Sequence, residues 1–478
     1  MVRVAPARSI EISRQGRKRS LMGGEGWMGA TGLVVEGAGE AVDRRRIREG
    51  TNAYCVRSPD GTSLQFAMPL LVPRPLPGGI EPGGADGAVW AIIEAVKRAA
   101  GADTRLRPLG GLDTERPARY AAGIEPVTLV HSDAAVGSDL WKPDEENIFL
   151  SDGLHCTVRG AVPYPGPPGG GAPRTVGEKV AALAEGIEEV MRRLPARDLA
   201  AAATLSLDQK LLRARLPSMG LVCFIGDGTL PARSYTRFRQ HHRVAGPKEG
   251  VHIPFHCPEE IGPTEVELPA SDRAVTGLGI RRREVFAVAG SNAQGKTTLL
   301  NAIRAGEDDH AAGDGRELIV TVRGARTAEA GGQHLNGADV SLFFGSLPPG
   351  MTGTPKAAFG QGSGSMTMAV QVGTAVREEA PLLLIDEDRA AANLLVRSTL
   401  QEEDVTPLAE ILAERPEALG STACIVATSS LDPLIARADR IMVLRGHGAG
   451  AITPAAFRAA YLEYLEQCAR MAKKDQEW

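Results

Sequence analysis

The sequence is poor in several features that would assign it to a particular class of protein. Aromatic residues make up only 4% of its 478 residues, so stacking surfaces for nucleic-acid bases are scarce. Its six cysteines form no CxxC pair, which favours reduced thiols over a disulfide framework. No apolar run approaches the ~20 residues of a transmembrane helix, and the net charge of −4 gives no general attraction to nucleic acid or anionic membranes. This net charge does not exclude a local basic groove that binds nucleic acid.

A P-loop motif dominates what the sequence does contain. Residues 285–289 are an apolar run that predicts a buried strand, and Leu299, Leu300 and Ile303 have the spacing of a helix. The Gly-rich turn between them matches GxxxxGK[ST], the pattern of loops that bind nucleotide phosphates. We therefore predict that the following residues bind ATP: Gly290, Ser291, Asn292, Ala293, Gln294, Gly295, Lys296, Thr297 and Thr298.

The residue types of this motif suit phosphate chemistry. Gly290 and Gly295 allow the backbone to curl so that successive N–H groups point toward phosphate oxygens. The positive end of the following helix dipole acts at the same place. Lys296 is long enough to reach the β- and γ-phosphates, and the Thr297 hydroxyl can ligate Mg²⁺. ATP and Mg²⁺ are therefore the expected cofactors, with Lys296 as a catalytic residue.

An acidic motif follows further along the chain. Residues 381–388 are an apolar run that predicts a strand, and this strand ends in three acids. Asp386 is expected to support the Mg²⁺ shell together with Thr297. Glu387, next to it, is placed to polarise the water that attacks the γ-phosphate. A P-loop ATPase needs such a second motif, and the prediction assigns Glu387 as its catalytic base.

A Gly/Ser-rich stretch lies between these two motifs. Residues 359–365 are predicted to form a loop that opens a helix. Ser363, Gly364 and Ser365 offer a hydroxyl, exposed N–H groups and a helix N-terminus, which together can bind a γ-phosphate. The order of P-loop, Gly/Ser loop and acidic strand resembles that of ABC-type ATPases, whose signature loop usually reads LSGGQ. The resemblance implies a homodimer, because in this class the signature loop binds the nucleotide held by the partner subunit.

The resemblance can be narrowed to one family. The sequence is similar to the predicted ATPases of the ABC class, described as soluble proteins distinct from transporter subunits. The similarity extends over residues 148–444, while the family's N-terminal segment is hard to find in the first 145 residues. The segments that carry it are residues 220–228, 230–234, 275–280, 313–317 with His310, and 385–388 with Ala392, Asn393 and Arg397.

Two positions depart from the usual ABC pattern. Many ABC enzymes place a histidine after the strand that follows the acidic motif, but here residues 425–428 lead into Ser429 and Ser430. We expect Ser429 or Ser430 to lie where that γ-phosphate sensor would sit, and assign Ser429 as a catalytic residue. Turnover is expected to be slow, since a hydroxyl can hydrogen-bond phosphate but cannot act as an imidazolium. The glutamine that usually links Mg²⁺ to the moving subdomain has two candidate replacements, Gln333 and Ser346. No aromatic residue is assigned to the adenine.

The predicted fold is α/β: a P-loop ABC-type ATPase core with a parallel sheet, plus a divergent N-terminal α+β region. Strands that end in the P-loop and in Asp386 alternate with helices, and both sites lie at carboxyl ends of strands. The expected segments are a basic disordered tail (1–20), the divergent region (21–170), a helical and strand segment (171–270), the ATPase core (271–450) and a C-terminal helix (451–478).

Three functions stay open at this point. The first is an ATPase whose closure as a homodimer acts on a macromolecule of unknown identity, with RNA or DNA as the expected partner. The second is the nucleotide-binding subunit of a transporter, which the large N-terminal region disfavours. The third is a P-loop small-molecule kinase, which would need neither Glu387 nor the signature loop. A cytoplasmic location is expected, and the basic N-terminus leaves import into an organelle open.

Overall fold

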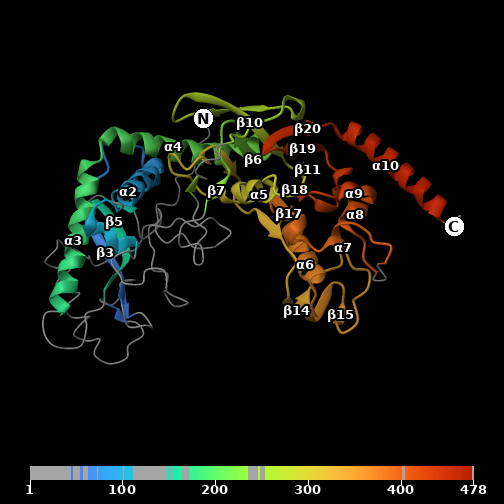
Figure 1. Ribbon diagram of the computed structural model, residues 1–478, viewed down its shortest axis with the longest axis horizontal. Helices are drawn as coiled ribbons and strands as arrows, with labels where there is room; N and C mark the ends of the chain where they lie inside the picture. The colour runs from blue at the N-terminus through green and yellow to red at the C-terminus, as the bar shows by residue number, and fades with distance from the viewer. Residues whose placement is uncertain are drawn as a thin grey trace. The chain divides into compact units, whose positions relative to one another are not determined.

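A computed structural model describes the backbone of about three-quarters of the chain, which forms two compact units (Figure 1). Unit 1 lies within Met1–Asp208, Ser234–Gly246 and Ala311–Asp314, and unit 2 within Gln209–Arg233, Pro247–His310 and Gly315–Trp478. The expected basic tail of residues 1–20 lies outside the described residues. These residues are 45–46, 54–57, 63–72, 74–100, 102–110, 148–150, 153–163, 172–234, 246–247, 253–400 and 404–475.

Unit 1 is an antiparallel sheet with helices, as an α+β region requires. Its strand order is β1-β2-β3-β5-β4. Apolar residues of the helices form a common core with Val72 and Leu154 of the sheet. The bounds are β1 (Arg45–Arg46), β2 (Tyr54–Arg57), β3 (Ser63–Val72), β4 (Ile148–Leu150), β5 (Gly153–Pro163), η2 (Pro82–Gly84), α2 (Ala85–Ala100), η3 (Thr104–Gly110), α3 (Ala172–Arg193) and the first part of α4 (Ala196–Arg215).

The strand β3 is longer than its sequence suggests. Residues 69–84, rich in proline and glycine, favour a connector, but β3 continues through Pro69 to Val72 and pairs with β5 over its whole length. Proline lacks an N–H and is tolerated where a strand has no neighbour on that side. The partner β2 pairs only with Leu64 to Ala67, so Pro69 lies beyond its end.

Unit 2 is built on a six-stranded sheet of order β13-β17-β18-β11-β19-β20. All neighbouring pairs are parallel except β19 with β20, so the predicted parallel core is confirmed. In parallel strands the carboxyl ends meet at one edge of the sheet, where ligands bind. The bounds are β11 (Val285–Ala289), β13 (Arg326–Ala328), β17 (Leu382–Asp386), β18 (Ala423–Thr428), β19 (Arg440–Arg445) and β20 (Gly448–Ile452).

This sheet is the middle of three layers, because its strands are buried on both faces. Alternate residues of β11 point to opposite sides: Val285, Ala287 and Ala289 join one core, and Phe286 and Val288 join another. The first core contains helices α6 (Gly364–Arg377), α7 (Ala392–Leu395), α8 (Leu408–Glu414) and α9 (Asp432–Ile435), and the second contains α5 (Lys296–Ala305). Figure 1 shows α6, α7 and α8 grouped beside β17.

A second, antiparallel sheet packs on the α5 side of this core. Its order is β12-β6-β10-β9, and Cys223, Ile225, Leu278 and Ile280 contribute to the same core as α5. Its other face packs against the last turn of α4 through Leu212. The bounds are β6 (Leu221–Gly226), β9 (Thr264–Leu268), β10 (Arg273–Arg281) and β12 (Ile319–Thr321), with η4 (Leu216–Met219), η5 (Glu259–Ile261) and the short strands β7 (Arg233–Ser234) and β8 (Gly246–Pro247) nearby in sequence.

A buried ion pair ties this antiparallel sheet to the parallel one. Arg440, at the start of β19, donates two hydrogen bonds to the Glu284 carboxylate, one of them 2.8 Å long. The same guanidinium donates to the Gly279 carbonyl oxygen of β10 at 2.6 Å and to the Ile261 carbonyl oxygen of η5 at 3.2 Å. The pair therefore links four separate segments of unit 2.

A small antiparallel sheet of order β14-β16-β15 lies before α6 in the chain. Residues 357–362 form its central strand, so most of the Gly/Ser stretch expected to be a loop is a strand, which ends directly before Ser363. The remaining bounds of unit 2 are β14 (Gln333–Ala338), β15 (Thr352–Thr354), β16 (Ala357–Gly362), η6 (Glu387–Arg389), η7 (Pro416–Leu419) and α10 (Pro454–Asp475).

The C-terminal helix α10 is only partly packed. Phe457 contacts the core, whereas Tyr464 and Leu465 of the same helix are exposed. None of the described helices is long and apolar enough to cross a membrane.

Candidate active site

The predicted P-loop has the backbone geometry of a phosphate cradle. It follows β11, and α5 begins at Lys296. Gly290 and Gly295 have φ of 139° and 99°, in the region that favours glycine. A Cβ at Gly290 would lie 2.5 Å from the Leu444 carbonyl oxygen, so a side chain has no room there. Ala293 also has a positive φ, 62°, a conformation that costs energy for a residue with a Cβ.

Lys296 lies folded over this loop. Its ammonium donates hydrogen bonds to the carbonyl oxygens of Gly290 at 2.7 Å and Ser291 at 2.9 Å. The residue is only 6% exposed, and these two carbonyl dipoles stabilise its charge in place of water. The loop is therefore closed on itself, and its lysine is already beside the place predicted for the phosphates.

Thr297 and Asp386 meet, as the sequence predicts for a magnesium site. The Thr297 hydroxyl donates to the Asp386 Oδ2 at 2.6 Å. A hydroxyl and a carboxylate are hard oxygen ligands of the kind that Mg²⁺ prefers, and they lie next to the lysine that faces the phosphates. The residues present therefore fit this ion. No group of three or more His, Cys, Asp or Glu side chains able to hold a metal occurs among the residues that the structure describes.

Glu387 lies among hydroxyl groups at the carboxyl end of the neighbouring strand, β18, and in the residues directly after it. Asp386 of β17 is level with Ala427 of β18, so the residues after the two strands emerge side by side. Glu387 Oε2 accepts from the Thr428 hydroxyl at 2.8 Å, the Ser429 N–H at 2.5 Å and the Ser429 hydroxyl at 3.1 Å. Glu387 Oε1 accepts from the Ser430 hydroxyl.

These bonds keep the Glu387 carboxyl ionised. Burial raises its pKa, but the hydrogen bonds from Ser430, from Ser429 and from Thr428 together outweigh burial, and the pKa lies below its ordinary value. Glu387 is therefore an anion at neutral pH, as a base must be. The sequence points to Ser429 as a sensor of phosphate, and the structure shows that this serine contacts Glu387.

The signature residues form a separate cluster. Ser363 is the N-cap of α6, and its hydroxyl accepts from the Met366 N–H. The Ser365 hydroxyl donates to Asn393 Oδ1 of α7 at 2.7 Å. Within the described ranges no hydrogen bond joins Ser363, Gly364 or Ser365 to the P-loop. The structure thus brings together the P-loop, Asp386, Glu387 and Ser429, and leaves the signature residues apart.

Sequence reasoning missed three residues of this region. Thr428 reads as the last residue of a buried strand, yet its side chain reaches Glu387. His447, in the turn between β19 and β20, donates its N–H to the Gln294 side chain at 3.4 Å and lies beside Gly295. Its φ of 65° marks an unusual backbone conformation. Asn393 is part of the family resemblance, but nothing in its sequence context indicates a partner on α6.

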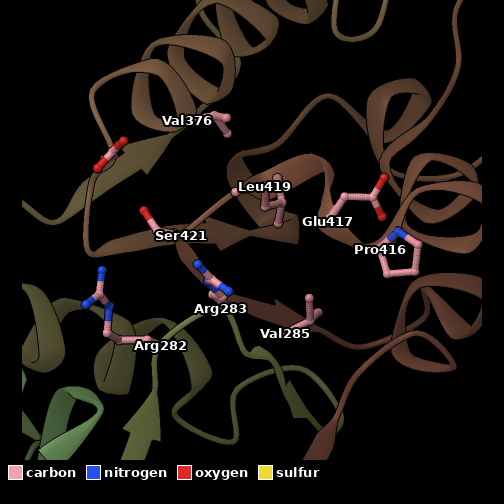
Figure 2. A pocket seen from close by; sticks show the side chains of 10 residues that line it. Arg282, Arg283, Val285, Val376, Pro416, Glu417, Leu419 and Ser421 are labelled. Atoms are coloured by element: carbon pink, nitrogen blue, oxygen red, sulfur yellow. The ribbon is translucent and has the colours of Figure 1, made fainter.

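A cavity of about 650 Å³ lies at the other edge of the same sheet (Figure 2). Arg282, Arg283 and Val285 line it at the amino end of β11, and Leu419 and Ser421 line it ahead of β18. The P-loop follows the carboxyl end of β11, so this cavity is distinct from the nucleotide site.

The position of the P-loop in the sheet defines the class of protein. Its strand lies between β18 and β19, with the acidic strand β17 one place further and a Ser-capped helix after a small inserted sheet, which is the P-loop domain of an ABC-type ATPase. A family model described as ABC_ATPase, P-loop domain, matches residues 195–476, more than half of the chain. The chain belongs to this family.

One relative and two solved structures show how far the similarity extends. Uncharacterized protein MJ1628 of Methanocaldococcus jannaschii is 39% identical over 420 residues, which cover 87% of this chain and 91% of the relative. CbiO1 of Clostridium perfringens, part of the ABC transporter complex CbiONQ, has a TM-score of 0.28 and 15% identity over 51% of this chain and 92% of its own. A nucleotide-free ATP-binding cassette from an ABC transporter has a TM-score of 0.25 and 17% identity, and the match covers 37% of this chain and 82% of the cassette. At such TM-scores these two structures support no argument.

Proposed function

We propose that this chain binds and hydrolyses ATP with Mg²⁺ as a homodimer, and that closure of the dimer acts on a macromolecule, with nucleic acid as the partner class. The observation that carries the proposal is the placement of Glu387 and Asp386 at the same sheet edge as Lys296 and Thr297. Phosphate-binding, metal-binding and base groups are then within one small region, as ATP hydrolysis requires.

Each residue has a role in this proposal. Lys296 and the N–H groups of the P-loop bind the β- and γ-phosphates. Thr297 and Asp386 would hold Mg²⁺, which supplies charge neutralisation for the phosphates when bound. Glu387 orients the attacking water and accepts its proton. The N-terminal end of α6, with Ser363, contributes to the second half of the site.

The separation of the signature residues supports the homodimer. Ser363 is exposed and caps a 14-residue helix whose N-terminus can bind an anion. It makes no hydrogen bond to the P-loop of its own chain within the described ranges. Two chains related by a two-fold axis would place Ser363 of each against the γ-phosphate held by Lys296 of the other. ATP would then bridge two surfaces that both favour negative charge.

The thiols support the expected cytoplasmic compartment. Cys223 and Cys424 are free and buried, and burial raises the pKa of each to about 12. Free buried cysteines are ordinary in a reducing compartment.

The first experiment measures phosphate release by a Glu387→Gln variant. The amide keeps the shape of the side chain and cannot accept a proton, so hydrolysis should fall by about 10²-fold or more while ATP still binds. ATP binding is measured by calorimetry on the same protein. If Glu387→Gln releases phosphate at the rate of the unaltered chain, Glu387 is not the base.

The second experiment measures mass by light scattering, with and without ATP and Mg²⁺. Glu387→Gln should become dimeric only with ATP. The same protein carrying Ser363→Arg should bind ATP and stay monomeric, because a bulky cation fills the signature loop. A Glu387→Gln chain that remains monomeric with ATP would refute the dimer, and so would a Ser363→Arg chain that hydrolyses ATP normally.

A further inference from the structure

The tip of the β19–β20 hairpin lies along the P-loop. The Leu444 carbonyl oxygen of β19 is 2.5 Å from the place that a Cβ on Gly290 would take. Three residues further along the chain, the N–H of His447 donates to the Gln294 side chain at 3.4 Å. The Nδ1 atom of His447 lies 4.0 Å from the place that a Cβ on Gly295 would take. The hairpin therefore contacts the P-loop at its first residue and again just before α5.

His447 occupies a position that favours glycine. Arg445 pairs with Gly448, so the hairpin turns through only two residues. These are Gly446 and His447, whose φ angles are 56° and 65°. Two-residue turns with positive φ at both positions favour sequences such as Asn-Gly or Gly-Gly, because a Cβ costs energy in this conformation. The imidazole is exposed and makes no hydrogen bond or ion pair with another residue of the described ranges, so no such contact offsets that cost.

The strand order places this turn on one particular side of the P-loop. Strand β11 lies between β18 and β19. Asp386 and Glu387 follow β17, which lies beyond β18, so the proposed metal ligand and base are on the β18 side. The γ-phosphate must point toward them, because the metal and the attacking water act on it. A triphosphate that lies across the loop then directs its ribose and base away from β18, toward the end of β19.

We propose that His447 is a nucleoside-binding residue whose imidazole stacks on the base of the ATP held by the P-loop. The inference rests on the proposed binding of ATP. Imidazole is a planar aromatic ring, and histidine is among the side chains on which bases stack. Aromatic residues make up only 4% of the chain, so a histidine in this place has few competitors for the role. The contacts of the turn with Gln294 and Gly295 hold the ring beside the loop before the nucleotide binds.

The test measures the affinity of the full chain for ATP and, separately, for tripolyphosphate, which has three linked phosphates and no nucleoside. Asparagine tolerates a positive φ, so His447→Asn keeps the turn and removes the ring. Calorimetry should show ATP binding about tenfold weaker in His447→Asn, the scale of base stacking on an aromatic side chain. Its affinity for tripolyphosphate should equal that of the parent chain. His447→Phe restores an aromatic ring and should bind ATP more tightly than His447→Asn.

A pair of glycine variants separates the ring from the backbone. His447→Gly removes the ring and suits the positive φ, so it should bind ATP more weakly without a fall in Tm. Asp272→Gly is the matched control, because Asp272 is exposed in the turn between β9 and β10 and has a φ of 52°. This variant should keep both its Tm and its ATP affinity.

The inference and the proposed function can fail separately. A parent chain that binds ATP no better than Lys296→Ala does would remove the proposed function. If the parent binds ATP and His447→Asn binds it equally well, the P-loop assignment stands and the role of His447 is refuted. Equal losses of ATP and tripolyphosphate affinity would also refute it, because the change would then act on the phosphate cradle. So would a His447→Phe variant that binds ATP no better than His447→Asn.

Discussion

The ion pair between Glu284 and Arg440 allows a stability prediction with a stated size. The residues are 5% and 9% exposed, and the guanidinium also lies 5.4 Å from the centre of the Phe286 ring. Glu284→Ala would leave Arg440 buried with two carbonyl oxygens as partners and no counter-charge. Breaking one side of a buried pair costs about 3–5 kcal/mol in the free energy of unfolding.

This cost corresponds to a large fall in thermal stability. For a domain of this size, 1 kcal/mol shifts Tm by about 2–4 °C, so Glu284→Ala should lower Tm by about 10 °C. The matched control is Glu378→Ala, which breaks the ion pair with Arg326. That pair is 2.6 Å long, but its side chains are 51% and 54% exposed, and surface pairs contribute about 0–1 kcal/mol.

The free energy of unfolding of the full chain is measured by urea denaturation, with far-UV circular dichroism as the signal. A double variant, Glu284→Leu with Arg440→Met, removes both charges and should be more stable than Glu284→Ala alone. The reasoning is refuted if Glu284→Ala is within about 1 kcal/mol of Glu378→Ala, the scale of a surface pair. A double variant less stable than the single one would mean that the carbonyl contacts of Arg440 outweigh its charge pairing.

Two further predictions concern the P-loop. Lys296→Ala should weaken ATP binding about tenfold or more, because a point charge beside the phosphates is lost, and calorimetry measures this affinity. Lys356→Ala, which changes an exposed lysine elsewhere, is the control. Normal ATP affinity in Lys296→Ala would refute the P-loop assignment. Gly290→Ala should abolish ATP binding and lower stability by about 1–3 kcal/mol, since its Cβ would lie 2.5 Å from the Leu444 carbonyl oxygen at a positive φ. Gly331→Ala, which has nothing within 4 Å, should change neither quantity, and equal effects of the two glycine changes would contradict this steric account.

The local parts of the site could be predicted from the sequence. The P-loop and the acidic motif each lie on one strand and the turn after it, so a short stretch of residue types is enough to indicate them. The sequence predicts a helix that opens at the Gly/Ser loop for the same reason, and in the structure Ser363 is the N-cap of α6.

The parts of the site that depend on strand pairing could not be predicted. Thr428 and Ser430 reach Glu387 only because β18 is the neighbour of β17 and Asp386 is level with Ala427. Nothing near Glu387 in the sequence specifies that register. Strand β16 was missed because its glycines favour a loop, and its structure is imposed by pairing with β14 and β15 on either side.

The division of the chain between the two units limits where the chain can be cut. Four residues from the middle of the ATPase sequence, Ala311–Asp314, belong to unit 1, and Ala311 packs against the core of that unit. Unit 1 is therefore not an appendage that ends where the ATPase begins. Cutting the gene after residue 208 would remove from the first product a segment that packs against its core, and would leave that segment in the second product. A protein fragment that ends at residue 208 therefore lacks a segment that packs against the core of unit 1.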